Sequence, residues 1–73
     1  MASKIDLFEK LKKDGVVYMK DDFLECAFRK VYKGGTFLKY KGCTESEVEF
    51  SNDTVFQIEL GGEFINEGQY AGY

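Results

Sequence analysis

The stretch "FLECAFRKVYKGGTFLKYK", residues 23–41, decides the fold class of this chain. Polarity alternates along its first part, where Cys26 and Phe28 share one side, as in a β-strand with one buried face. The glycine pair at 34–35 is typical of a hairpin turn, because glycine adopts positive φ angles without strain. The run after the turn is again rich in aromatic residues, which suit strands. The stretch therefore predicts two antiparallel strands, at residues 23–33 and 36–41.

The N-terminal segment has the pattern of an amphipathic helix. Ser3 is a favourable N-cap residue, and Gly15 suits the left-handed position that follows a helix. Phe8 and Leu11 recur at helical spacing, so we expect both to pack on the sheet. The pattern predicts a helix over about residues 3–13. If Phe8 is buried, its replacement by alanine should cost roughly 3–5 kcal/mol.

Further short β-rich runs flank the hairpin and are separated by turn-forming pairs of Asp, Asn and Gly. Near the end, Phe64 and Ile65 predict a short strand, and Asn66 predicts the cap of one helical turn. We expect an α+β fold in a single domain, 1–73, with an N-terminal helix packed on a four- to five-stranded antiparallel meander sheet. A small, partly open barrel is the alternative, and the element order resembles that of Sm-like small barrels. The predicted strands are 15–20, 23–33, 36–41, 47–51 and 54–60, followed by a tail at 63–73.

The composition excludes several classes of protein. The chain has no histidine, and its two cysteines, Cys26 and Cys43, lack the spacing of a zinc motif. Phosphate-binding loops and dinucleotide fingerprints are also missing. We therefore predict a non-enzymatic protein without a cofactor or a metal ion. No signal-peptide pattern begins the chain, so we expect free, reduced cysteines and a cytoplasmic location, in the host cell if the protein is viral.

Charge is distributed unevenly along the chain. Residues 1–41 carry ten basic and six acidic side chains, a net charge of +4, whereas residues 42–73 carry seven acids and no base. One interpretation is structural: Lys39 and Lys41 would face Glu47 and Glu49 across neighbouring strands. The other is functional: acids without a nearby base would form a patch that binds a basic partner. The patch residues would be Asp53, Glu59, Glu63 and Glu67.

The function favoured by these observations is that of an acidic protein-binding module. Small size, acidity and an aromatic-rich composition resemble, in general style, phage-encoded inhibitors that occlude a basic, nucleic-acid-binding surface of a host protein. A nucleic-acid-binding role for the basic aromatic hairpin at 28–42 is one alternative. That role would use Arg29, Lys30, Lys33, Lys39 and Lys41. A structural oligomerisation subunit is another alternative.

Self-association is a further expectation. A short chain with twelve aromatic residues, seven Phe and five Tyr, has more apolar surface than a small core readily covers. We predict a homodimer. By strand alternation, the residues on its interface would be Phe37, Val55 and Phe64.

Overall fold

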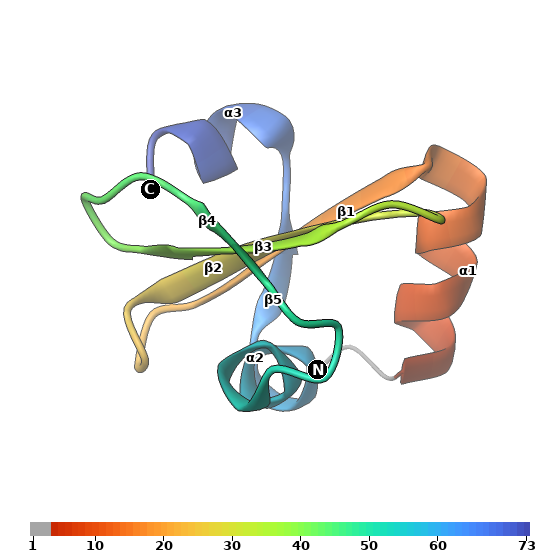
Figure 1. The fold of residues 1–73 in the computed structure, drawn as a ribbon, viewed down its shortest axis with the longest axis horizontal. Helices are drawn as coiled ribbons and strands as arrows, with labels where there is room; N and C mark the ends of the chain where they lie inside the picture. The colour runs from red at the N-terminus through yellow and green to blue at the C-terminus, as the bar shows by residue number, and fades with distance from the viewer. Residues whose placement is uncertain (1–3) are drawn as a thin grey trace.

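The computed structural model describes the backbone of residues 4–73 and the side chains from Leu7 onward. Within these residues, an open five-stranded antiparallel sheet carries helices on both faces (Figure 1). The α+β fold class is therefore confirmed, and the sheet does not close into a barrel. The elements in chain order are α1 (Lys4–Asp14), β1 (Val16–Asp21), β2 (Cys26–Val31), β3 (Thr36–Tyr40), β4 (Ser46–Val48), α2 (Asp53–Gly61), β5 (Glu63–Ile65) and α3 (Glu67–Ala71).

The strand order is β4-β3-β2-β1-β5, so the first four strands form a meander. The chain then crosses the sheet through α2, and β5 pairs with the other edge of β1, where Ile65 lies opposite Tyr18. In the predicted hairpin, Phe28 lies opposite Leu38 in the register of β2 and β3. Both strands are shorter than predicted, and β2 begins only at Cys26 because residues 22–25 form a turn that starts at Asp21.

The hairpin turn differs from the prediction in its backbone. Lys33, and neither glycine, has the positive φ angle, at 57°. The glycines are needed for space instead. A Cβ atom on Gly34 would lie 2.9 Å from Cγ1 of Val31, and one on Gly35 would lie 2.9 Å from a carboxylate oxygen of Glu47. Any larger residue at either position would push these neighbours away.

Helix α1 ends as predicted but presents a different face to the sheet. Gly15 has a φ angle of 81°, and its N–H donates to the carbonyl of Leu11 at 2.9 Å. Leu7 and Leu11, four residues apart, are buried in the core, whereas Phe8 is 63% exposed. The prediction that Phe8 is a core residue is therefore wrong, since it lies one position around the helix from the buried stripe. The predicted N-cap, Ser3, lies outside the described residues.

Segment 54–60, predicted as a strand, lies in helix α2. Asn52 caps this helix: its side-chain oxygen accepts from the N–H of Val55 at 3.1 Å. The buried residues of α2 are Val55, Ile58 and Glu59, which follow helical spacing. The pattern escapes sequence analysis because Glu59, one of its three members, is charged.

The C-terminal tail follows the prediction closely. Its strand is β5, and Asn66 caps α3 through a reciprocal pair of hydrogen bonds with Gln69. Helix α3 packs on one face of the sheet through Tyr70, next to Ala27 and Ile65. Helices α1 and α2 cover the opposite face, where they bury Val17, Met19 and Phe28. Figure 1 shows α2 and α3 on opposite sides of the sheet.

Candidate functional site

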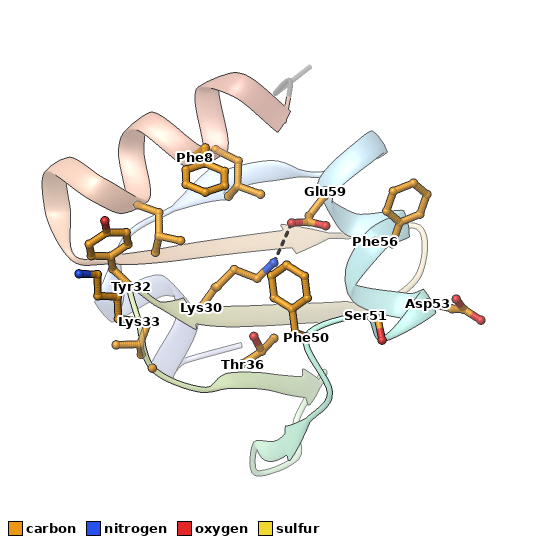
Figure 2. Close-up of a pocket in the computed structure, with 14 residues that line it drawn as sticks. Phe8, Lys30, Tyr32, Lys33, Thr36, Phe50, Ser51, Asp53, Phe56 and Glu59 are labelled. Carbon is orange, nitrogen blue, oxygen red and sulfur yellow. Dashed lines mark hydrogen bonds and ion pairs between the residues drawn. The ribbon is translucent and has the colours of Figure 1, made fainter.

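A groove of about 670 Å³ opens on the face of the sheet covered by α1 and α2 (Figure 2). Its walls come from α1, the β2–β3 turn, the loop that joins β4 to α2, and α2 itself. Four aromatic side chains line the groove, and four separate segments contribute them: Phe8, Tyr32, Phe50 and Phe56. A concave apolar surface of this size is typical of binding sites.

Two of these aromatic side chains are largely exposed, and a third is partly exposed. Phe50 is 79% exposed, Phe8 63% and Phe56 43%. Burial of a phenylalanine side chain contributes roughly 1.5–3 kcal/mol to the free energy of unfolding. The exposed parts of these three rings do not make that contribution within this chain. A cluster of exposed apolar side chains marks an interaction surface on a small protein. The sequence pattern did not indicate this groove, because Phe8 was predicted to pack on the sheet and segment 54–60, which contains Phe56, was predicted to be a strand.

The floor of the groove holds a buried ion pair. Nζ of Lys30, on β2, donates to Oε2 of Glu59, on α2, at 3.0 Å. Both residues are buried, and Nζ of Lys30 also lies 4.8 Å from the ring centre of Phe50. The two charges compensate each other at the base of the groove. The pair therefore joins β2 to α2 and leaves the floor polar without a net charge.

The other face of the sheet holds a second polar cluster. Arg29 donates two hydrogen bonds to the carboxylate of Glu45, from Nη2 at 2.8 Å and from Nε at 3.3 Å. The hydroxyl of Tyr70 donates to the same carboxylate at 2.6 Å. The Arg29 guanidinium also lies 4.1 Å from the ring centre of Phe37, in a cation–π arrangement. The cluster ties α3 and the β3–β4 loop to the sheet.

These contacts change the pKa values of the residues involved. The hydrogen bond from Arg29 is the main cause that holds the pKa of Glu45 below its ordinary value, and the bond from Tyr70 acts in the same direction. Burial raises the pKa of the Tyr70 hydroxyl, and its bond to Glu45 adds to this effect. Glu45 is therefore ionised and Tyr70 is a neutral donor at pH 7.

Acidification is expected to weaken the fold through Glu45. Because its folded pKa lies below the ordinary value of 4.5, the stabilisation is complete above pH 4.5 and is lost as the pH falls through the folded pKa. Urea-unfolding midpoints between pH 7 and pH 3 measure this effect. We expect Glu45→Gln to lower the midpoint at pH 7 and to lose less stability than the wild type on acidification. Equal losses in both proteins would assign the acid sensitivity to other carboxylates.

The four acids predicted to form one patch are not brought together. Glu59 is buried against Lys30, and Glu63 lies 3.4 Å from Nζ of Lys20. The prediction that these two acids lack a nearby base is therefore wrong. Asp53 lies on the groove face at the start of α2, whereas Glu67 lies in α3, on the opposite face. Their separation in the fold divides the predicted patch between two faces.

The predicted basic residues are also divided between the faces. Lys30 is paired with Glu59 on the groove face, and Arg29 with Glu45 on the other. Lys39 is buried, and its Nζ donates to the carbonyls of Tyr70 and Ala71 at 3.0 and 2.9 Å. Lys33 and Lys41 are exposed. This arrangement does not present the five cations as one continuous surface for nucleic acid.

The predicted cross-strand charge pairs do not form either. Glu47 lies opposite Phe37 in the register of β3 and β4, and Lys39 points its ammonium group at the end of α3. Among the described residues, Lys41, Glu47 and Glu49 take part in no ion pair. Lys39 instead satisfies carbonyl groups at the end of α3, where helices lack internal partners.

The three predicted dimer-interface residues occupy different environments. Val55 is fully buried in the core, so its assignment to an exposed face is wrong. Phe64 is partly buried against the core under α1 and α2, whereas Phe37 lies on the opposite face beside Arg29. These residues do not form one surface. Homodimerisation itself stays a prediction.

The cysteines and possible metal ligands add no second site. Cys26 is buried, Cys43 is exposed, and both thiols are free. Burial is the main cause that raises the pKa of Cys26, which disfavours its reactive thiolate form. Within residues 4–73, no three Cys, Asp or Glu side chains are grouped so that they could hold a metal ion. No helix in the same part of the chain has the length and apolarity to span a membrane.

Comparison with known proteins identifies a shared fold. No protein-family model matches the sequence, and no curated protein matches it. Among solved structures, the chain is similar to a chain in the crystal structure of the complex between the Type VI effector Tas1 and its immunity protein. The TM-score is 0.79 at 22% sequence identity, and the similarity covers 97% of this chain and 92% of that chain. The two chains therefore share one fold over almost their whole lengths.

Proposed function

We propose that this chain is a protein-binding inhibitor of the immunity type, which neutralises a partner protein by occupying part of its surface. The observation that carries the proposal is the similarity to a chain of an effector–immunity complex, with 97% and 92% of the two chains covered. Such coverage makes that chain close in length to this one, and we take it to be the immunity protein of the complex. A small single-layer sheet with its helices then acts as the whole binding module.

The groove supports the same proposal through its surface chemistry. The side chains described from Leu7 onward leave an apolar concave surface open, and Phe8, Phe50 and Phe56 line it. Interfaces draw most of their binding energy from a few aromatic or arginine side chains near their centre. Exposed rings that contribute little to the core are well suited to that role.

The polar groups of the groove support binding over catalysis. Lys30 and Glu59 bond to each other, so the two charged groups on the floor are paired. A general acid or base must instead reach a proton of the substrate. The narrower expectations that the source is a phage and that the target surface is basic stay predictions from the sequence.

Affinity capture followed by an activity assay tests the proposed function. The tagged chain is used to isolate proteins from its source cells, and each stoichiometric partner is identified and produced separately. We expect one partner whose expression alone slows growth and whose co-expression with this chain restores it. A lysate passed over Phe28→Ala, a variant expected to unfold, controls for non-specific capture. A tight complex without any rescue of growth would contradict the inhibitor role.

A further inference from the structure

The groove carries opposite charges at its two ends. Lys33 in the β2–β3 turn and Asp53 in the first turn of α2 both line it and are exposed. Figure 2 shows Lys33 at one end and Asp53 at the start of α2 at the other, with Phe50 and the Lys30–Glu59 pair between them and the Asp53 carboxylate directed outward from α2. Since the floor pair is neutral overall, the electrostatic character of the groove is set by its ends.

Neighbouring residues reinforce the basic end. The N–H of Tyr32 donates to the carbonyl of Gly15 at 2.9 Å, which places the β2–β3 turn beside the end of α1. The last turn of α1 carries Lys12 and Lys13, and both are exposed. Neither these lysines nor Lys33 forms an ion pair with a described residue.

The acidic end is built in the same way. Glu49 is exposed and immediately precedes Phe50, and its carbonyl accepts from the N–H of Asn52 at 3.0 Å. This turn holds Glu49 close to the start of α2, where Asp53 lies. Neither acid forms an ion pair with a described residue. The groove therefore has one basic and one acidic end, each with charges available to a partner.

The sheet topology restricts the backbone conformation of the occupant. The floor residues Lys30 and Thr36 belong to β2 and β3, which both have a neighbouring strand on each side. An extended peptide cannot add a strand there, because strand addition needs a free sheet edge. An α-helix satisfies its own backbone hydrogen bonds and presents apolar side chains along one face. A helix therefore matches a groove whose walls are side chains.

We propose that the groove binds one amphipathic helix of the partner protein, with its apolar side chains between Phe8, Phe50 and Phe56. The helix carries acidic residues where it meets Lys33 and basic residues where it meets Asp53. The identity of the partner rests on the proposed function, whereas the chemistry of the occupant rests on the groove. Rim charges of this kind orient a ligand and raise its association rate more than its affinity.

A synthetic peptide tests the docking mode without knowledge of the partner. The probe is a helical peptide of about 18 residues, long enough to be helical, with one leucine face, glutamates in its first turn and lysines in its last. It is titrated into the ¹⁵N-labelled chain and followed by NMR. We expect amide shifts to change at residues 30–35 and 50–56 and to stay constant around Phe37 and α3. A peptide of the same composition with its leucines spread around the helix is the control.

Matched variants of the chain separate apolar from charge effects. Phe50→Ser should weaken peptide binding at least about tenfold, as for a central interface residue. The control is Phe23→Ser, because Phe23 is 94% exposed and lies outside the groove, and this variant should bind like the wild type. Lys33→Glu and Asp53→Lys should each weaken binding severalfold and flatten its salt dependence. Lys41→Glu, an exposed charge outside the groove, should do neither.

The outcomes distinguish this inference from the proposed function. Absence of shifts in the groove at millimolar peptide, or shifts confined to the α3 face, would overturn helix docking. Self-association of the wild type that Phe50→Ser abolishes, together with no peptide binding, would assign the groove to a second copy and also overturn it. A captured partner that binds Phe50→Ser as tightly as the wild type would be consistent with the inhibitor role. It would show that the partner does not bind through the groove. Peptide binding in the groove without any inhibited partner would support helix docking and contradict the inhibitor role.

Discussion

Replacement of Glu59 by leucine is expected to remove most of the free energy of unfolding of this protein at neutral pH and 25 °C. The substitution leaves the Lys30 ammonium buried on β2 without the carboxylate that lies 3.0 Å from it. Removing one partner of a buried ion pair costs roughly 3–5 kcal/mol. Small domains have total stabilities near the lower end of about 5–15 kcal/mol, so the loss takes most of what is available. Circular dichroism during urea titration measures the change in the free energy of unfolding.

The double variant Lys30→Met/Glu59→Leu is the matched control for this prediction. It removes both charges and fills the space with apolar groups, which is often neutral or stabilising by about 1–4 kcal/mol. We therefore expect the double variant to be folded and to differ from the wild type far less than Glu59→Leu does. If Glu59→Leu alone melts like the wild type, the pair is solvated and the description of the groove floor is wrong.

Replacement of Phe28 by alanine is expected to cost roughly 3–5 kcal/mol, whereas Phe8→Ala should change stability by about 0.5 kcal/mol. Phe28 is fully buried on β2 at the centre of the core formed with α1 and α2. Phe8 is 63% exposed on α1, so its truncation opens no cavity. Both variants remove the same atoms, and the difference between their unfolding free energies therefore reports the difference in burial.

Differential scanning calorimetry of the two variants checks this contrast. Because the domain is small, a loss of about 1 kcal/mol lowers Tm by roughly 4–8 °C. We expect Phe28→Ala to lose its cooperative transition or to show it at a far lower temperature, and Phe8→Ala to keep a transition near that of the wild type. A large loss for Phe8→Ala would place its ring in the core and remove one wall residue from the proposed binding groove.

Local signals in the sequence determined several elements of this protein by themselves. Gly15 ends α1, and Asn66 caps α3, because each of these residues acts through hydrogen bonds to neighbours within four positions in the chain. The hairpin of β2 and β3 follows from a short turn between two runs with strand character. The α+β class follows from these pieces, because an amphipathic helix and a sheet with one apolar face must bury their surfaces together.

Only the tertiary structure decided which charged residues are buried, and this determined the surface that we propose for binding. Sequence analysis assigns Glu59 and Lys39 to the solvent-exposed surface, because burial of an unpaired charge costs free energy. In the fold, Glu59 meets Lys30 across 29 positions and Lys39 meets the end of α3 across 31. Burial of Glu59 completes the buried stripe of α2, and Phe56 of the same helix lines the groove. The periodicity of a sequence reports only on residues that are close in the chain, so it does not detect partners that are this distant. Helix α2, the separation of the acidic residues and the open groove are therefore seen only in the folded chain.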